Sequence, residues 1–105
     1  MGTLYIINVH IVSRAILNDY CRKHPETKSQ LEAWYYEVKN SNWNSPVEIK
    51  ERYGSASIIG NNRVVFNIKG NKYRLVVKIN YKMKIIYLRF FGTHKDYNKI
   101  NAEEI

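Results

Sequence analysis

Three apolar runs that alternate with polar residues lie between Arg63 and Phe91, and they constrain the fold more than any other part of the sequence. Successive side chains of an extended strand point to opposite faces of a sheet, so the apolar members of each run share one face. These members are Val64, Phe66, Ile68, Tyr73, Leu75, Val77, Ile79, Ile86, Leu88 and Phe90. The connections Lys69–Asn71 and Asn80–Met83 have the length and composition of hairpin turns. The stretch therefore predicts a three-stranded antiparallel meander.

The opposite face of the predicted meander carries cations without acids. Its members are Val65, Asn67, Lys72, Arg74, Val76, Lys78, Tyr87 and Arg89. The whole chain has 17 Lys and Arg residues against 9 Asp and Glu, a formal net charge of +8. A basic face on a basic protein favours a polyanionic partner, either nucleic acid or an acidic protein.

Apolar residues at helical spacing predict helices before the meander. The first helix follows a cap at Ser13, buries Ile16, Leu17, Tyr20 and Cys21, and stops at Pro25. The second buries Leu31, Trp34, Tyr35 and Val38. Thr27 and Gln30 have the spacing of a capping box at its start. Trp43, in the polar run after it, has two interpretations: it packs between helices or it stacks on a base.

Capping signals predict a third helix and a final helical turn. Ser45, Pro46 and Glu48 form the start of a helix that closes at Gly54. Residues 55–62 then lead into the meander as a connection. After Gly92, Thr93 caps a last turn with Asp96 three residues on.

The order of these elements predicts an α+β domain with the helices on one face of a small antiparallel sheet and the other face open. The 105 residues suit a single domain spanning 1–105. Residues 1–9 are interpreted as a leader or, within Leu4–Val12, an edge strand. Residues 99–105 are expected to form a polar tail.

Several classes of chemistry have no support in the sequence. Cys21 is the single cysteine and the three histidines are widely spaced, so neither a disulfide nor a metal site is expected. No glycine-rich phosphate loop indicates a nucleotide cofactor. The apolar start is interrupted by Asn8 and His10 and does not resemble a membrane span. We therefore expect a cytoplasmic protein that uses no cofactor.

The basic face and the segment after it hold the parts for RNA cleavage without metal, namely a proton-transfer group and cations around the phosphate. The catalytic candidates are Lys72, Arg74, Arg89, His94 and Tyr97; the RNA-binding candidates are Asn71, Lys78, Tyr87 and Lys95. Neighbouring strands would let Arg74 and Arg89 converge on one phosphate. The alternative is that the arginines are solvated strand residues, that His94 is a surface group and that Tyr97 closes the core.

The runs HIVSRAIL, HPETKSQLEAWY, RVVFNIKGNKYRLVVKINY and IIYLRFFGTHKDYNKI, in this order, resemble the HigB-type toxins of bacterial type II toxin–antitoxin systems. The resemblance extends from about His10 to Ile100. It implies a RelE-like fold and an mRNA interferase without metal cofactors, typically acting on mRNA in the ribosome. It also implies a HigA-type antitoxin with a helix-turn-helix domain. The family's basic strand positions fall on Lys72, Arg74 and Arg89, and its C-terminal histidine and tyrosine on His94 and Tyr97.

Two other functions remain open at the level of sequence. In one, the basic face grips RNA or an acidic partner without chemistry. In the other, the chain inhibits DNA gyrase, as ParE-like relatives do. The first is distinguished by the absence of RNA cleavage products and the second by a damaged-DNA response.

Overall fold

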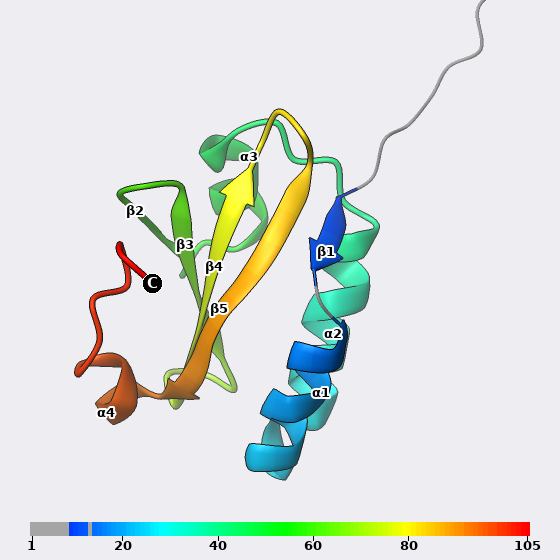
Figure 1. Cartoon of the computed structure of the whole chain (residues 1–105). Coiled ribbons are helices and arrows are strands. Elements are labelled where there is room, and N and C mark those ends of the chain that lie inside the picture. The colour runs from blue at the N-terminus through cyan, green and yellow to red at the C-terminus, as the bar shows by residue number, and fades with distance from the viewer. Residues whose placement is uncertain (1–8, 13) are drawn as a thin grey trace, which may run out of the picture.

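The computed structural model describes residues 9–12 and 14–105, which form one sheet flanked by helices (Figure 1). The elements in chain order are β1 (His10–Val12), α1 (Arg14–Lys23), the 3-10 helix η1 (Pro25–Thr27), α2 (Lys28–Lys39), α3 (Pro46–Arg52), β2 (Ser57–Ile59), β3 (Arg63–Ile68), β4 (Tyr73–Asn80), β5 (Ile85–Thr93) and α4 (His94–Tyr97). The strands follow the order β1-β5-β4-β3-β2. β1 pairs with β5 in parallel, and all other pairs are antiparallel. The predicted α+β class and the β3–β5 meander are confirmed.

The two outer strands are short. β1 confirms the predicted edge strand at residues 10–12, where Ile11 pairs with Ile86. The remainder of the predicted leader, residues 1–8, lies outside the described residues. β2 was not anticipated, because its three residues are too few to show an alternating pattern. It adds to β3 through the pair Ile58 and Val64, within the stretch that the sequence presented as a plain connection.

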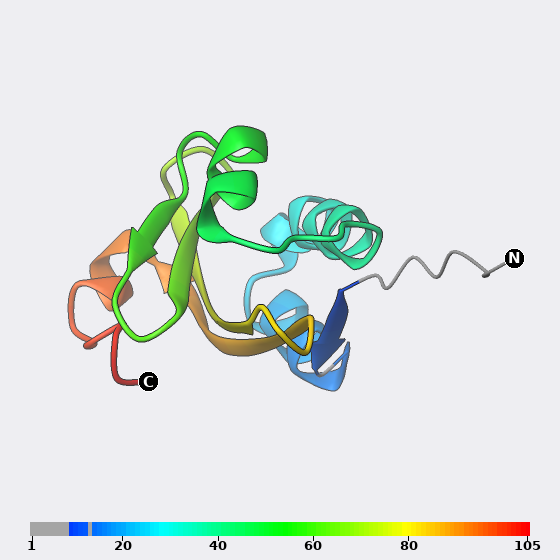
Figure 2. The same cartoon turned by 90° about the horizontal axis from the view of Figure 1, so that it is seen from above.

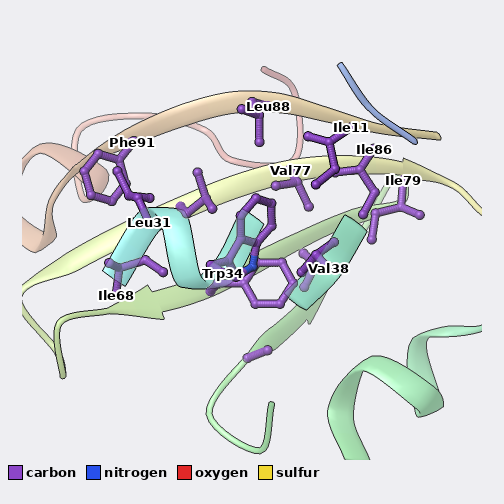
Figure 3. Close-up of a cluster of buried hydrophobic side chains, with 14 of the residues drawn as sticks. Ile11, Leu31, Trp34, Val38, Ile68, Val77, Ile79, Ile86, Leu88 and Phe91 are labelled. Atoms are coloured by element: carbon purple, nitrogen blue, oxygen red, sulfur yellow. The ribbon is translucent and has the colours of Figure 1, made fainter. Parts of the chain in front are cut away.

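Helices α1, α2 and α3 cover one face of the sheet (Figure 2). The predicted apolar stripe of α2 supplies Leu31, Trp34 and Val38, all of them buried. Figure 3 shows these side chains against the apolar face of the meander, where Val77, Ile79 and Ile86 lie. Burying this stripe is what orients the helix, since amphipathic helices owe most of their stability to packing.

Trp43 belongs to this core. Its ring stacks on Phe66 with 6.2 Å between centroids and meets the edge of Tyr53. Only 7% of its surface is exposed. Of its two interpretations, packing is therefore right and base stacking is wrong.

A β-bulge in β5 corrects the predicted pattern of the third strand. Val76 pairs with Phe90 while Val77 pairs with Leu88, so Arg89 is an extra residue without a partner on β4. An extra residue reverses the alternation beyond it. Phe91 therefore enters the core where Phe90 was predicted, and the ring of Phe90 lies on the opposite face.

The face predicted to be open is partly covered by α4 and the C-terminal segment (residues 98–105), which lie on the far side of the sheet from α1 and α2 (Figures 1 and 2). A second hydrophobic cluster forms there, and this second cluster consists of Val65, Val76 and Ala102 with the partly buried Ile59, Phe90, Tyr97, Ile100 and Ile105. The prediction of an open face and a merely polar tail was wrong. Val65, Val76 and Phe90 together make an apolar patch that a solvated face does not carry.

Polar contacts hold the C-terminal segment in place. Arg63, which is 8% exposed, donates from Nε to the carbonyl oxygen of Ile105 at 3.0 Å and from Nη1 to that of Asn61 at 2.8 Å. The carboxylate of Glu103 accepts from the amide of Gly60 at 3.3 Å. The bonds to Ile105 and Glu103 join the segment to the start of β3 and to the β2–β3 turn.

The capping predictions have mixed outcomes. Thr93 accepts from the amide of Asp96 at 3.1 Å, so its capping role is confirmed. Thr27 makes no capping-box bond; its hydroxyl instead donates to the carbonyl of His24 at 2.7 Å and closes η1. At α3, Glu48 reaches back to the amide of Asn44, and the side chain of Ser45 does not cap. The cap predicted at Ser13 lies outside the described residues.

Because of the bulge, replacing Phe90 and replacing Phe91 should lower the free energy of unfolding by different amounts. Phe91 stacks on Tyr73 and is 7% exposed, so we expect Phe91→Ala to lower the free energy of unfolding by about 3–5 kcal/mol. Phe90→Ala should cost less, because its ring is partly exposed in the smaller second cluster. Urea denaturation of both variants measures this difference. A larger loss for Phe90→Ala would contradict the bulge.

Candidate functional site

Apart from Tyr97, the predicted site residues separate into two groups. The hairpin-end cluster comprises Asn71, Lys72, Arg74, His94 and Lys95, where the β3–β4 turn meets α4. The basic groove is a cavity of about 620 Å³ lined by Asn62, Lys78, Ile79, Asn80, Tyr81, Lys82, Tyr87 and Arg89. On β4 the second cluster separates them, since Val76 lies between Arg74 and Lys78.

Arg74 is held at the hairpin end by its strand pairing and by backbone carbonyls. It lies opposite Asn67 on β3 and Gly92 on β5. Its Nη1 donates to the carbonyl oxygens of Asn71 at 2.9 Å and Tyr73 at 3.3 Å. A neutral carbonyl leaves the positive charge in place, so the guanidinium retains its capacity for a phosphate.

His94 is fixed beside Lys72 by the backbone. The amide of His94 donates to the carbonyl of Lys72 at 3.1 Å, which joins the start of α4 to the β3–β4 turn. Thr93 caps the same turn of helix. The side chains of His94, Lys72 and Lys95 are all exposed. The backbone is therefore ordered while the imidazole can reach a ligand.

The backbone at Gly92, two residues before His94, lies close to the Phe90 ring of the second cluster. A Cβ at this position would lie 2.8 Å from the ring tip of Phe90 and 3.4 Å from the Cβ of Asp96. Glycine is needed here for space. The position links the packing of Phe90 to the start of α4.

Tyr97 has a packing role. Its ring belongs to the second cluster and is half-buried, as the alternative interpretation of Tyr97 expected. Because Tyr97 is one helical turn after His94, its packing fixes α4 against the sheet. It thereby sets the position of the histidine.

The basic groove brings together Lys78, Tyr87 and Arg89, which the sequence placed on one face. Lys78 pairs with Tyr87 across β4 and β5. Sequence reasoning missed Asn62, Tyr81 and Lys82, since it read the last two as hairpin-turn residues. Cations and aromatic rings in one groove suit single-stranded nucleic acid, whose phosphates and bases they contact respectively.

The structure does not bring Arg74 and Arg89 to one point. Arg74 lies opposite Gly92, three residues beyond Arg89 on β5 and therefore about 10 Å along the strand. Arg89 instead lines the groove with Lys78. The prediction of convergence on one phosphate assumed a regular strand, and the bulge removes that assumption.

Charge is distributed differently on the two sides of the sheet. Within residues 9–12 and 14–105 the ion pairs are Arg14–Glu32, Arg22–Asp19 and Arg52–Glu37, and the imidazole of His24 lies 3.8 Å from the carboxylate of Glu26. All of these contacts are in or beside the helices α1 to α3 and η1. None involves a cation of the hairpin-end cluster or the basic groove. In the part of the chain that the structure describes, these cations are therefore not neutralised by a neighbouring carboxylate, as binding of a polyanion requires.

A side-chain hydrogen bond on the helical side of the sheet supports the hairpin-end cluster. The hydroxyl of Tyr73 donates to the carboxylate of Glu26 on η1, and this bond lowers the pKa of Glu26. It also raises the pKa of Tyr73. The rings of His24 and Phe91 form a T-shaped pair in the same place, with 5.6 Å between their centroids. Sequence reasoning missed this support, because Glu26 and Tyr73 are 47 residues apart.

The described residues offer neither a metal-binding cluster nor a membrane-spanning helix. Among them, no three His, Cys, Asp or Glu side chains come together in a way that could hold a metal ion. No helix among them is both long and apolar enough to cross a bilayer.

Residues 27–100 match the family model of the HigB toxin, described as the RelE-like toxic component of a toxin–antitoxin system. The chain belongs to the HigB toxin family. All residues of the hairpin-end cluster and of the basic groove fall inside the matched range. As the toxic component of such a system, a HigB-family chain has an antitoxin as its partner.

Curated HigB proteins align with most of the chain. The mRNA interferase toxin HigB of Escherichia coli strain K12 is 26% identical over 96 residues, covering 90% of this chain and 92% of that protein. The mRNA interferase HigB of Escherichia coli O6:H1 is 24% identical over 94 residues, covering 88% and 91%. The mRNA interferase HigB of Shigella flexneri is 26% identical over 96 residues.

The separation of the two arginines in this HigB-family chain predicts independent contributions to RNA binding. Distant sites without shared partners have additive effects, so the coupling free energy between Arg74→Ala and Arg89→Ala should stay below about 0.5 kcal/mol. Lys78→Ala and Arg89→Ala line one groove and should couple more strongly. A double-mutant cycle on binding of a 2′-O-methyl RNA measures both values. Strong coupling of the two arginines would restore the single-phosphate arrangement.

Proposed function

We propose that this chain is an mRNA interferase, an endoribonuclease that cleaves mRNA at the hairpin-end cluster and thereby stops translation. The observation that carries the proposal is the exposed imidazole of His94, held by its backbone beside Lys72 and next to the strand that carries Arg74. The similarity to HigB proteins named as mRNA interferases supports the same activity.

The proposed reaction uses the ribose 2′-oxygen of the substrate as the nucleophile. Its attack on phosphorus forms a 2′,3′-cyclic phosphate while the bond to the 5′-oxygen breaks. The 2′-hydroxyl gives up a proton to a base, and the departing 5′-oxygen takes one from an acid. Between these steps the phosphorane carries extra negative charge, which nearby cations stabilise.

Each residue of the hairpin-end cluster has a part in this scheme. His94 transfers a proton, because imidazole titrates near neutral pH. Arg74 binds the scissile phosphate, since its guanidinium can donate to two oxygens. Lys72 adds a point charge, and Asn71 and Lys95 contact the flanking nucleotide. Tyr97 is a positioning residue that acts through the packing of α4.

The basic groove holds RNA on one side of the cleavage point. Arg89 and Lys78 bind phosphates there, and Tyr87 offers a ring to a base. Arg89 is therefore assigned to binding, in place of the role beside Arg74 that the sequence predicted. A long single-stranded path with cleavage at one end fits mRNA presented by the ribosome, so we infer a ribosome-dependent nuclease that acts in the cytoplasm.

The inferred protein partner is a HigA-type antitoxin with a helix-turn-helix domain. An acidic segment of such a partner would be attracted to the unpaired cations of the hairpin-end cluster and the groove. Binding there would block access of RNA to His94.

The test is primer extension on a defined mRNA after brief induction of the protein, with and without a block of translation. We expect translation-dependent cuts with the wild type. His94→Ala and Arg74→Ala should each reduce them by about 100-fold or more, because each removes a transition-state contact.

His10→Ala and Arg22→Ala are matched controls. Both side chains are exposed, on β1 and α1, and neither belongs to the hairpin-end cluster or to the lining of the basic groove. They should leave the cuts unchanged. Growth arrest without any cuts would overturn the nuclease and favour simple binding or a gyrase target. Undiminished cuts in folded His94→Ala would remove the proton-transfer role.

A further inference from the structure

One side-chain hydrogen bond joins the start of β4 to the helical side of the sheet. The hydroxyl of Tyr73, the first residue of β4, donates to the carboxylate of Glu26 in η1. Tyr73 is only 9% exposed, and its ring stacks on Phe91 with 5.4 Å between centroids. Packing therefore holds the side chain that presents this hydroxyl to Glu26.

Glu26 lies on a firmly held connection between α1 and α2. Pro25 fixes the backbone angle φ at the start of η1. The fully buried Thr27 closes the turn, because its amide and its hydroxyl both donate to the carbonyl oxygen of His24, at 2.9 and 2.7 Å. The Nζ of Lys69, in the β3–β4 turn, donates to the carbonyl oxygen of Glu26 at 3.4 Å. A second bond thus ties η1 to this turn.

The backbone around Tyr73 holds the residues that we assign to the scissile phosphate. Its carbonyl oxygen accepts from Nη1 of Arg74 at 3.3 Å. The carbonyl oxygen of the preceding residue, Lys72, accepts from the amide of His94 at 3.1 Å. Across the strands Tyr73 pairs with Thr93, which caps α4 immediately before His94. A displacement of Tyr73 therefore displaces Lys72, Arg74 and His94 with it.

We propose that the hydrogen bond between Tyr73 and Glu26 is a positioning contact for RNA cleavage, and that both residues act through Arg74 and His94. The inference rests on the proposed nuclease. Tyr73 packs into the core that the helices cover, so its effect on the reaction is transmitted by the backbone. Positioning is sensitive, since a misplacement of about 1 Å at a reacting group can reduce the rate about 100-fold.

The bond should act on the local backbone more than on global stability. The Glu26 side chain is 44% exposed, so water hydrates the carboxylate when the hydroxyl of Tyr73 is removed. Tyr73→Phe keeps the ring that stacks on Phe91. We therefore expect the free energy of unfolding of Tyr73→Phe to change little, while local opening at the start of β4 becomes more frequent.

Hydrogen exchange of single amides, followed by NMR in the full-length protein, tests the positioning directly. The reporter is the amide of His94, and the reference is the amide of Ile79, which donates to the carbonyl oxygen of Asn62 at 2.9 Å near the other end of β4. Tyr73→Phe should speed up exchange at His94 at least tenfold and leave exchange at Ile79 unchanged. Equal acceleration of both amides, or none at His94, would overturn the proposal.

Matched variants separate the bond from the side chains that form it. Glu26→Ala should reproduce the effect of Tyr73→Phe, and the double variant should exceed neither, because both changes remove the same bond. Glu26→Gln keeps an oxygen that can accept from the hydroxyl and should retain most of the protection at His94. The control Tyr20→Phe removes a hydroxyl from another ring packed on Phe91, at 5.6 Å. Faster exchange in this control, or full protection in Glu26→Ala, would contradict the proposal.

Cleavage and binding of RNA are measured on the same variants. Tyr73→Phe should reduce the translation-dependent cuts at least tenfold and weaken binding of a 2′-O-methyl RNA less than threefold, because the basic groove still holds the RNA. In a His94→Ala background Tyr73→Phe should reduce the cuts less than threefold further. Undiminished cuts in Tyr73→Phe would overturn the positioning role. Absence of cuts in the wild type would overturn the nuclease instead, and exchange at His94 would still decide whether the bond fixes the hairpin-end cluster.

Discussion

The burial of β4 on both faces is the constraint on which the rest of the structure depends. Leu75, Val76 and Val77 are consecutive and fully buried. A strand at the centre of a sheet can bury successive residues only if both faces are covered. Helices α1 to α3 cover one face, and the second cluster with the C-terminal segment covers the middle of the other. The cations of β4, Arg74 and Lys78, therefore lie on either side of the buried middle of the strand.

This division gives each part of the proposed RNA-binding surface a separate support. At one end, the β3–β4 turn and α4 are joined by the bond between the His94 amide and the Lys72 carbonyl. At the other end, the bulge leaves Arg89 without a partner on β4, and Arg89 lines the groove with Lys78. Bulges commonly re-aim side chains next to functional sites. The apolar cover between the two ends keeps them apart and holds α4 through Tyr97.

The helical side of the sheet has a different distribution of charge. In the described part of the chain, acids there pair with cations, as Glu32 does with Arg14, so that side offers little net attraction to a polyanion. This side also holds a cavity of about 280 Å³, whose walls include Ala33, Ala56 and Phe66. The two sides of the same sheet thus differ in charge, with unpaired cations on one side and ion pairs on the other.

The sequence by itself determined the meander, the apolar stripes of α1 and α2, and the sign of charge on the site, because these depend on local periodicity and composition. It also supplied the family resemblance and the candidates His94, Arg74 and Lys72. The tertiary structure decided the bulge at Arg89, the exchange of Phe90 for Phe91, and the cover over Val65 and Val76. These depend on strand register and on contacts between residues distant in the chain, such as Arg63 with Ile105, and such contacts leave no periodic signal in a single sequence.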